Sequence, residues 1–224
     1  MKELADVYKV PGMLTAHEVD YLFLLGQIDH CDGVIVEIGS WKGKSTIALA
    51  RGAATTHREK IYAIDPHAVQ PEEGYLDDTR AEFLANLKQA GVDSQVVPMI
   101  MNSEKAAHGW SKPIRLLWID GDHRYEPAQL DFKLWEPFVV EGGIIAMHDT
   151  IRKKGPKRVL WENVFLSDRF QDIAIVDNIT AVKKVHKAPR AARLRKWLTL
   201  AARSLHRGAQ EPGSPRQAFR ASAA

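Results

Sequence analysis

The sequence predicts an α/β protein with a doubly wound, mostly parallel sheet that ends in an antiparallel hairpin at its C-terminal edge. First, short β-branched apolar runs alternate with segments of helical period, which is the pattern of strand–helix–strand units. Second, Phe170 to Val185 contains two strand-like runs joined at Asp177-Asn178, which is typical of an antiparallel hairpin. A parallel sheet covered by helices on both faces, with a hairpin at one edge, satisfies both observations.

The first helix is predicted from a capping box, in which Thr15 is followed three residues later by Glu18. Apolar residues at helical spacing extend this helix over about residues 16–30. Strands and helices then alternate along the chain. We expect strands at 33–39, 60–65, 94–101, 114–120 and 142–149, and helices at 45–50, 78–90, 103–108 and 127–135.

The composition is that of a globular protein with one main domain. The 224 residues are 45% hydrophobic and 26% charged. Cys31 is the single cysteine, which excludes an intramolecular disulfide and thiol metal clusters, and which fits a reducing, cytoplasmic compartment. No apolar stretch approaches the roughly 20 residues that a membrane span needs. We expect a main domain over residues 1–186 and a basic tail over residues 187–224.

The tail differs from the main domain in charge. Residues 183–224 contain eleven Lys or Arg and one acid, a net charge of +10, whereas residues 1–182 have a net charge of −7. An acidic main domain argues against a nucleic-acid partner. The tail is also amphipathic, with apolar residues at helical spacing among cations: Leu194, Trp197, Leu198, Ala201 and Leu205.

Two uses of this amphipathic segment remain open. It is suited to an anionic membrane surface, or to docking on the acidic main domain or on a second subunit of a homo-oligomer such as a dimer. Residues 208–224 are rich in Gly, Pro, Ser and Ala, and we expect them to be disordered.

The loop after the first predicted strand, "VEIGSWKGKS", has the features of a ligand cradle. Gly39 and Gly43 allow a close approach of the backbone, and the helix that follows offers free N–H groups to an anionic group. Asp65 ends the next strand, where an acid can accept hydrogen bonds from ribose hydroxyls. A nucleoside cofactor or a structural turn explains this pattern. The glycine spacing departs from that of dinucleotide sites, which points away from NAD.

Four stretches together resemble class I S-adenosylmethionine-dependent methyltransferases: "VEIGSWKGKSTIALA", "IYAID", "IDGDHRYE" and "EGGIIAMHDT". They are most similar to the cation-dependent O-methyltransferases, which include catechol and caffeoyl-CoA enzymes and the macrocin and mycinamicin sugar enzymes. The sugar O-methyltransferases of methylmannose polysaccharide synthesis are another similar type. The resemblance covers about residues 33–150. It implies a Rossmann-like fold with S-adenosylmethionine as the cofactor.

The resemblance also implies roles for individual residues near the cofactor. Asp65 would hold the ribose hydroxyls, and Ser103 would lie beside the adenine. Trp41 would lie near the sulfonium, where a cation–π contact is favourable, or else is a packing aromatic. The residues expected to contact the cofactor are Glu37, Gly39, Ser40, Trp41, Gly43, Ser45, Asp65, Ser103 and Asp120.

At two further strand ends, the resemblance implies a divalent cation, Mg²⁺ or Mn²⁺, held by Asp120, His148 and Asp149. The cation would lower the pKa of the acceptor hydroxyl and orient it. His123 would be the general base. His148 has three open readings: a metal ligand, a second base, or a histidine bonded to a neighbour. Asp122 is expected to cap a loop.

The expected acceptor is a hydroxyl of a sugar or polysaccharide precursor, and a small secondary metabolite is the alternative. Residues 71–78, "PEEGYLDD", are polar and rich in turn-forming residues, as in a mobile loop over a site. His67 is expected to be an exposed loop histidine. A second class of enzyme also remains open, because cephalosporin-hydroxylase-like proteins share this fold and could use Asp120, His148 and Asp149 to bind iron.

Overall fold

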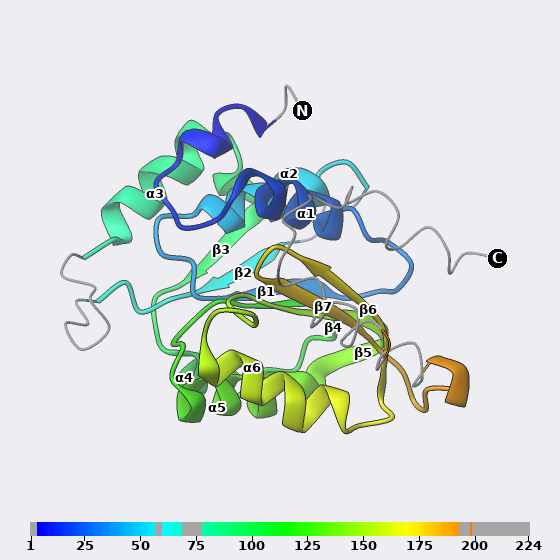
Figure 1. The fold of residues 1–224 in the computed structure, drawn as a ribbon. Coiled ribbons are helices and arrows are strands. Elements are labelled where there is room, and N and C mark those ends of the chain that lie inside the picture. Colours follow the sequence, from blue (N-terminus) through cyan, green and yellow to red (C-terminus); the bar gives the residue numbers. More distant parts are fainter. Residues whose placement is uncertain (1–3, 57–59, 69–77, 193–197, 199–224) are drawn as a thin grey trace.

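The computed structural model describes residues 4–56, 60–68, 78–192 and 198. Its centre is a seven-stranded sheet with the order β3-β2-β1-β4-β5-β7-β6 (Figure 1). The strands are β1 (Val34–Ile38), β2 (Ile61–Ile64), β3 (Val96–Met99), β4 (Ile114–Ile119), β5 (Val139–Met147), β6 (Phe170–Val176) and β7 (Ile179–Lys184). The first five strands are parallel, and β7 pairs antiparallel with both β5 and β6. The predicted fold class, including the hairpin at the edge, is confirmed.

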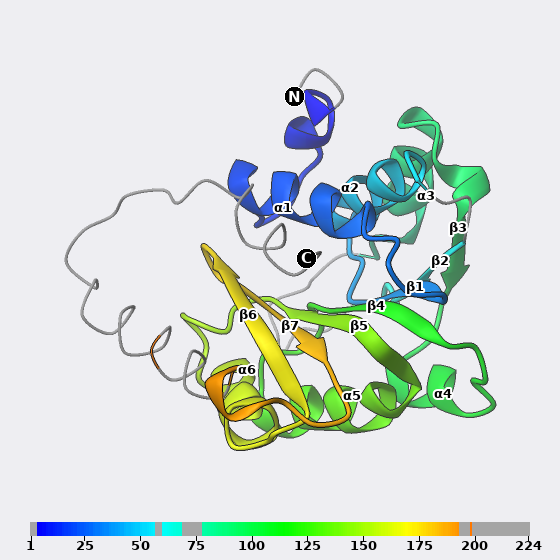
Figure 2. The same cartoon turned by 90° about the vertical axis from the view of Figure 1, so that its right-hand side faces the viewer.

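Helices cover both faces of this sheet, with α1, α2 and α3 on one face and α4, α5 and α6 on the other (Figures 1 and 2). The α-helices are α1 (Ala16–Gly26), α2 (Lys44–Ala53), α3 (Arg80–Gln89), α4 (Ser103–Ala107), α5 (Tyr125–Trp135) and α6 (Lys154–Leu160). Shorter helical turns are η2 (Val7–Lys9), η4 (Asp93–Gln95), η5 (Glu136–Phe138) and the π-helical η6 (Trp161–Phe165).

The hydrophobic core consists of two clusters, one on each face of the sheet. Leu116 and Trp118 of β4 pack with α1 and α2, whereas Leu117 and Ile119 pack with α5 and α6. All six residues of β4 are buried. Because successive side chains of a strand point to opposite faces, a strand covered on both sides is mostly apolar, as β4 is at every position except Arg115.

The position of α1 follows from close packing against α2. A Cβ atom on Gly52 would lie 2.1 Å from the carbonyl oxygen of Phe23, and one on Gly26 would lie 2.4 Å from that of Leu49. The fully buried Arg115 of β4 donates hydrogen bonds to the carbonyl oxygens of Gly26 and Ile28. These contacts satisfy backbone acceptors at and just after the C-terminal end of α1, which ends at Gly26 and not at about residue 30 as predicted.

The capping box at the start of α1 is confirmed, since the Thr15 hydroxyl accepts from the amide of Glu18 and the Glu18 carboxylate accepts from that of Thr15. The segment after β5 was not predicted as a helix. Gly155 and Pro156 both lie in the first turn of α6, where proline is tolerated because its missing N–H has no helical partner.

Two predicted segments fall largely outside the described residues, namely the loop at 71–78, of which only Asp78 is described, and the amphipathic part of the tail. The start of the tail packs on the main domain, where the buried Ala188 donates its amide to the carbonyl oxygen of Asp168 over 2.6 Å. Among the residues described, none of the helices combines the length and apolar character that spanning a bilayer requires.

Candidate active site

The predicted site residues follow the carboxyl ends of neighbouring parallel strands. Gly39 follows β1, Asp65 follows β2, Asp120 follows β4, and His148 follows β5. The hydrogen-bonded ladder continues past two of these strand ends, because the Asp120 amide donates to Ile38 over 2.8 Å and the His148 amide donates to Ile119 over 3.0 Å. Strand pairing therefore aligns the glycine loop, Asp120 and His148 along one edge of the sheet.

The loop after β1 lies directly against the residue that carries the central carboxylate. Gly39 has a φ of +85°, and a Cβ atom at this position would lie 2.1 Å from the carbonyl oxygen of Asp120. Its amide donates to Ile64 of β2 over 2.9 Å. A side chain at Gly39 would thus push the loop away from Asp120, so glycine is required here for both its conformation and its size.

Asp65 organises the glycine loop through its carboxylate. One oxygen accepts hydrogen bonds from the backbone amides of Ser40 and Trp41, both over 2.8 Å, and the other accepts from the amide of His67 over 2.7 Å. Trp41 has a left-handed φ of 40°, and the ammonium group of Lys42 lies 5.0 Å from the centre of its ring. Asp65 therefore holds the loop after β1 and the chain after β2 together.

Glu37 and Ser45, which were predicted to contact a cofactor, contact each other. Glu37 is fully buried, and its two oxygens accept hydrogen bonds from the hydroxyls of Ser45 and Thr46, each over 2.5 Å. Burial raises the pKa of Glu37 to about 7. These bonds join the end of β1 to the first turn of α2, where Gly43 is the left-handed N-cap residue. Sequence reasoning did not identify Thr46.

Ser103 begins α4, and its hydroxyl donates a hydrogen bond to Asp131 of α5. Burial raises the pKa of Asp131 to about 6. Because Asp131 lies in the middle of an amphipathic helix, nothing in the local sequence distinguished it from a solvent-facing acid.

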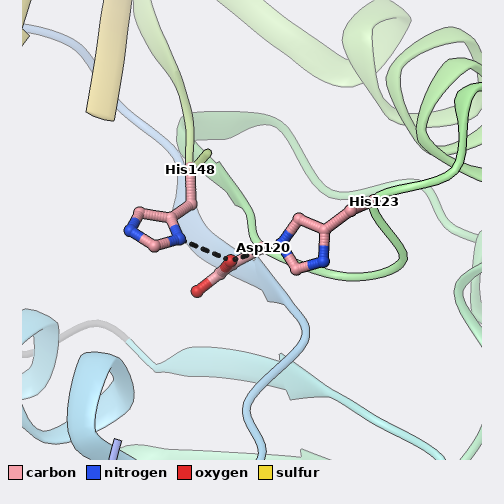
Figure 3. Close-up of side chains that lie close together, drawn as sticks. All are labelled: Asp120, His123 and His148. Atoms are coloured by element: carbon pink, nitrogen blue, oxygen red, sulfur yellow. Dashed lines mark ion pairs between the residues drawn. The ribbon is translucent and has the colours of Figure 1, made fainter. Parts of the chain in front are cut away.

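Asp120, His123 and His148 form a compact group, called the Asp120 cluster below. Figure 3 shows the Asp120 carboxylate between the two imidazole rings. Its Oδ1 atom lies 3.1 Å from Nδ1 of His148 and 3.7 Å from Nε2 of His123. One ligand atom from each residue falls within 4.8 Å of the others, which is a suitable arrangement for a metal ion. The sequence predicted Asp120, His148 and Asp149 as the metal ligands and His123 as the base, whereas in the structure His123, and not Asp149, completes this compact group.

Asp149 lies at the edge of the Asp120 cluster. Its Oδ2 atom is 3.1 Å from Nε2 of His123 and 4.0 Å from Nδ1 of His148. The contact with His123 is an ion pair without hydrogen-bond alignment, since Nε2 of His123 is buried without a hydrogen-bond partner among the described residues. The imidazole of His123 holds the pKa of Asp149 below the usual range. A φ of 52° at Asp149 turns the chain sharply after His148.

Glu18 is a site residue that sequence reasoning missed. It is fully buried, and its Oε1 atom lies 3.3 Å from Nε2 of His148 and accepts from the amide of Asn178 over 2.9 Å. The other oxygen accepts from the amide of Thr15 over 2.8 Å. In the sequence, the capping box already accounts for a glutamate at position 18, so nothing there indicated a second role. Its contact with His148 spans 130 positions and depends on the packing of α1 near the β6–β7 turn.

Both histidines of the Asp120 cluster are strongly basic in this environment. Burial alone would lower the pKa of His148, but the carboxylates of Asp120 and Glu18 outweigh burial and raise the pKa to about 10. The carboxylate of Asp120, and then that of Asp149, raises the pKa of His123 to about 9. The His123 side chain is 29% exposed and that of His148 is 6% exposed, so His123 is the more accessible of the two.

Two predictions about neighbouring residues have opposite outcomes. Asp122 caps its loop as predicted, since it accepts from the amide and the guanidinium group of Arg124, each over 2.7 Å. The prediction that His67 is exposed was wrong. His67 is 3% exposed, and its Nδ1 atom lies 2.9 Å from the Thr79 hydroxyl. The centre of its ring is 4.7 Å from the centre of the Phe83 ring. Burial lowers its pKa.

Comparisons with known proteins agree with this geometry. The sequence profile of a family described as "Methyltransferase domain" matches residues 36–150, which run from within β1 to just after β5 and include the Asp120 cluster. An uncharacterized protein of Acanthamoeba polyphaga mimivirus, R132, is 27% identical over 124 residues, which are 53% of this chain and 52% of the mimivirus protein. The chain thus spans about half the length of this curated relative.

Solved structures have the same fold at low sequence identity. The cofactor-bound structure of Rv0187 from MTB has a TM-score of 0.64 and 20% identity, and the match covers 82% of this chain and 90% of that one. An O-methyltransferase from Bacillus cereus in complex with SAH has a TM-score of 0.62 and 18% identity, covering 82% and 91%. These likenesses establish a common architecture.

Proposed function

The chain belongs to the methyltransferase-domain family, and we propose that it is an S-adenosylmethionine-dependent O-methyltransferase that uses a divalent cation and acts on a sugar hydroxyl. One observation carries the proposal. The glycine loop that would hold a methyl donor touches the backbone of Asp120, whose carboxylate is the centre of a group able to bind a cation and accept a proton. Donor and acceptor sites would therefore be adjacent, as methyl transfer requires.

The loop after β1 fits S-adenosylmethionine. Gly39 has no side chain to fill the space beside Asp120, and the first turn of α2 begins at the left-handed Gly43. Asp65 accepts bonds from three backbone amides, two on Oδ2 and one on Oδ1, and each oxygen has two lone pairs, so Oδ1 retains capacity to accept from one ribose hydroxyl. The SAH bound to the structurally similar Bacillus cereus enzyme supports this assignment.

The Asp120 cluster fits a divalent cation by its donor set. Asp120 and His148 would ligate the cation, with Asp149 at the edge of the cluster, and His123 would stay unligated. An imidazole in the donor set suits Mn²⁺ better than Mg²⁺, which prefers oxygen ligands. Glu18 faces the far nitrogen of His148, as carboxylates do behind metal-binding histidines, and would hold the ring in place. When bound, the cation would lower the pKa of the acceptor hydroxyl and fix its orientation.

His123 is the residue best placed to take the proton. It is more exposed than His148, and Asp120 and Asp149 would stabilise the imidazolium that it becomes. The acceptor oxygen would give its proton to Nε2 of His123 and form a bond to the methyl carbon, while the bond from that carbon to sulfur breaks and S-adenosylhomocysteine leaves. His148 is held on both sides by carboxylates, which suits a fixed ligand rather than a base.

One specific observation favours a second candidate function. Two histidines and one carboxylate form the donor set of many non-haem iron oxygenases, and Asp120, His123 and His148 provide this set. A metal-dependent oxygenase on the same fold is therefore the alternative. The two functions differ in what they consume, because only an oxygenase needs molecular oxygen for turnover.

The test is transfer of a labelled methyl group from S-adenosylmethionine to a panel of sugars and phenolic secondary metabolites. We expect methyl transfer to sugars. EDTA should abolish this transfer, and added Mn²⁺ should restore it. His123→Ala should lose turnover while S-adenosylhomocysteine affinity is retained, and His108→Ala, on an exposed residue at the end of α4, should keep both. Oxygen consumption with iron, without methyl transfer, would replace the proposal with the oxygenase alternative.

A further inference from the structure

A group of exposed cations follows the Asp120 cluster in the chain. We call it the cationic rim, and it consists of Arg152, Lys153, Lys154 and Lys157. All four are exposed, whereas Gly155 and Pro156 between them are buried. The rim thus occupies the outward side of the turn after β5 and of the first turn of α6.

Two backbone contacts place the cationic rim beside the proposed base and cation site. The amide of Lys153 donates to the carbonyl oxygen of Asp149 over 2.9 Å. A Cβ atom on Gly155 would lie 2.2 Å from the carbonyl oxygen of His123, so the first turn of α6 packs directly on the His123 loop. The charge of Lys153 also contributes to the low pKa of Asp149. The rim is therefore held at the border of the site.

The rim cations also differ from other cations of the same region in their pairing. Arg158, one residue further along α6, pairs with Glu162 over 2.7 Å and lies 3.9 Å from the ring centre of Tyr125. Arg124 on the His123 loop pairs with Asp122. Over the ranges that the structure describes, none of the four rim side chains has such a carboxylate partner.

Unneutralised cations at the border of a site attract an anionic ligand. Phosphate is a good match, because several flexible ammonium groups can contact its oxygens without requiring a fixed geometry. A long nucleic acid is a poorer match, since the rim lies within residues 152–157 only and residues 1–182 have a net charge of −7. The rim therefore suits a small phosphate ester.

We propose that the acceptor carries a phosphate ester, which the cationic rim binds while the acceptor hydroxyl lies at His123. The proposal rests on the proposed function, because it adds a substrate class to the same site. Sugar monophosphates and nucleotide diphosphate sugars share the chemistry that the rim would recognise. Neutral sugars lack it, so the rim would separate phosphorylated acceptors from free ones.

Calorimetry on the full chain with S-adenosylhomocysteine present tests the proposal. The probes are glucose, glucose 6-phosphate, UDP-glucose and a single-stranded oligonucleotide. The rim variant is Lys153→Gln with Lys154→Gln and Lys157→Gln. The control is Lys9→Gln with Lys88→Gln and Lys133→Gln, which changes the net charge equally at exposed lysines on other elements.

We expect at least one phosphorylated probe to bind and glucose not to, with the rim variant weakening that binding by about tenfold or more. The control variant should bind as the unchanged protein does, and the tighter of the two phosphorylated probes identifies the ester type. Absence of binding by both, equal loss in the control, or tightest binding by the oligonucleotide would overturn the proposal. A separate titration with S-adenosylhomocysteine alone tests the proposed function. If S-adenosylhomocysteine does not bind, the proposed function fails; if it binds but neither phosphorylated probe does, only the proposal for the cationic rim fails.

Discussion

Glu18 of α1 lies against His148 at the end of β5, with Oε1 of the glutamate 3.3 Å from Nε2 of the imidazole. The opposite nitrogen of the same ring is 3.1 Å from Asp120. His148 is thus fixed between two carboxylates that are far apart in the sequence, one in α1 and one directly after β4. The same glutamate caps α1 and binds the amide of Asn178, so the helix and the β6–β7 turn are tied to the site through one side chain.

Replacement of this glutamate tests its contact with His148. Glu18→Gln keeps the shape but has one acceptor oxygen for three donors, so we expect the free energy of unfolding to fall by about 1–3 kcal/mol. Loss of the charge behind His148 should weaken Mn²⁺ binding by about 10–100-fold. Urea denaturation and Mn²⁺ calorimetry measure the two effects. Glu104→Gln, on an exposed residue in the first turn of α4, is the control. An unchanged Mn²⁺ affinity in folded Glu18→Gln protein would show that the carboxylate does not support a metal ligand.

Gly39 tests the contact between the glycine loop and Asp120. Gly39→Ala places a methyl group 2.1 Å from the Asp120 carbonyl oxygen in a left-handed conformation, so we expect a loss of more than about 2 kcal/mol of stability together with loss of S-adenosylhomocysteine binding. Gly91→Ala has a similar φ, +69°, with no atom within 4 Å, and should cost about 1 kcal/mol without affecting binding. Equal effects of the two substitutions in denaturation and calorimetry would contradict the assigned contact.

The raised pKa of His123 predicts how stability changes with pH. The folded-state pKa is about 9, above the ordinary 6.5, so protonation stabilises the metal-free fold fully below pH 6.5. This contribution disappears as the pH rises to about 9. The difference in unfolding free energy between the unchanged protein and His123→Gln should therefore shrink between pH 6.5 and pH 9. His30→Gln, at an exposed histidine, serves as the reference, and a pH-independent difference for His123→Gln would refute the assignment.

Asp65 is predicted to bind the cofactor and to order the loop. Asp65→Asn replaces one acceptor oxygen by an NH₂ group that faces backbone amides, so we expect S-adenosylhomocysteine affinity to fall by at least about tenfold. Calorimetry measures the change, with Asp93→Asn at an exposed position as the control. Retention of full affinity would move the ribose site away from β2.

The sheet and the strand ends were accessible from sequence because each depends on local patterns. The apolar residues Leu116–Ile119 of β4 indicate burial on both faces, and the polar residues directly after them are brought to the same edge by parallel pairing. The convergence of Asp120, His123 and His148 follows from this topology. The left-handed turn at Asp177 that joins β6 to β7 was likewise predictable from the residues in it.

Contacts that depend on the packing of distant elements were not accessible. Glu18 reaches His148 because Gly26 and Gly52 bring α1 close to α2, a fact that neither helix shows by itself. His67 is buried because α3 covers it with Phe83. Helix α6 was not predicted, and its contact with the His123 loop depends on the small Gly155, which leaves room for the carbonyl oxygen of His123.

A calorimetric titration of the full chain with S-adenosylhomocysteine tests the central claim most directly. Binding to one site per chain, retained in His123→Ala, is the result that a methyltransferase with a separate cofactor cradle and proton acceptor predicts. Absence of binding by both S-adenosylhomocysteine and S-adenosylmethionine would contradict it.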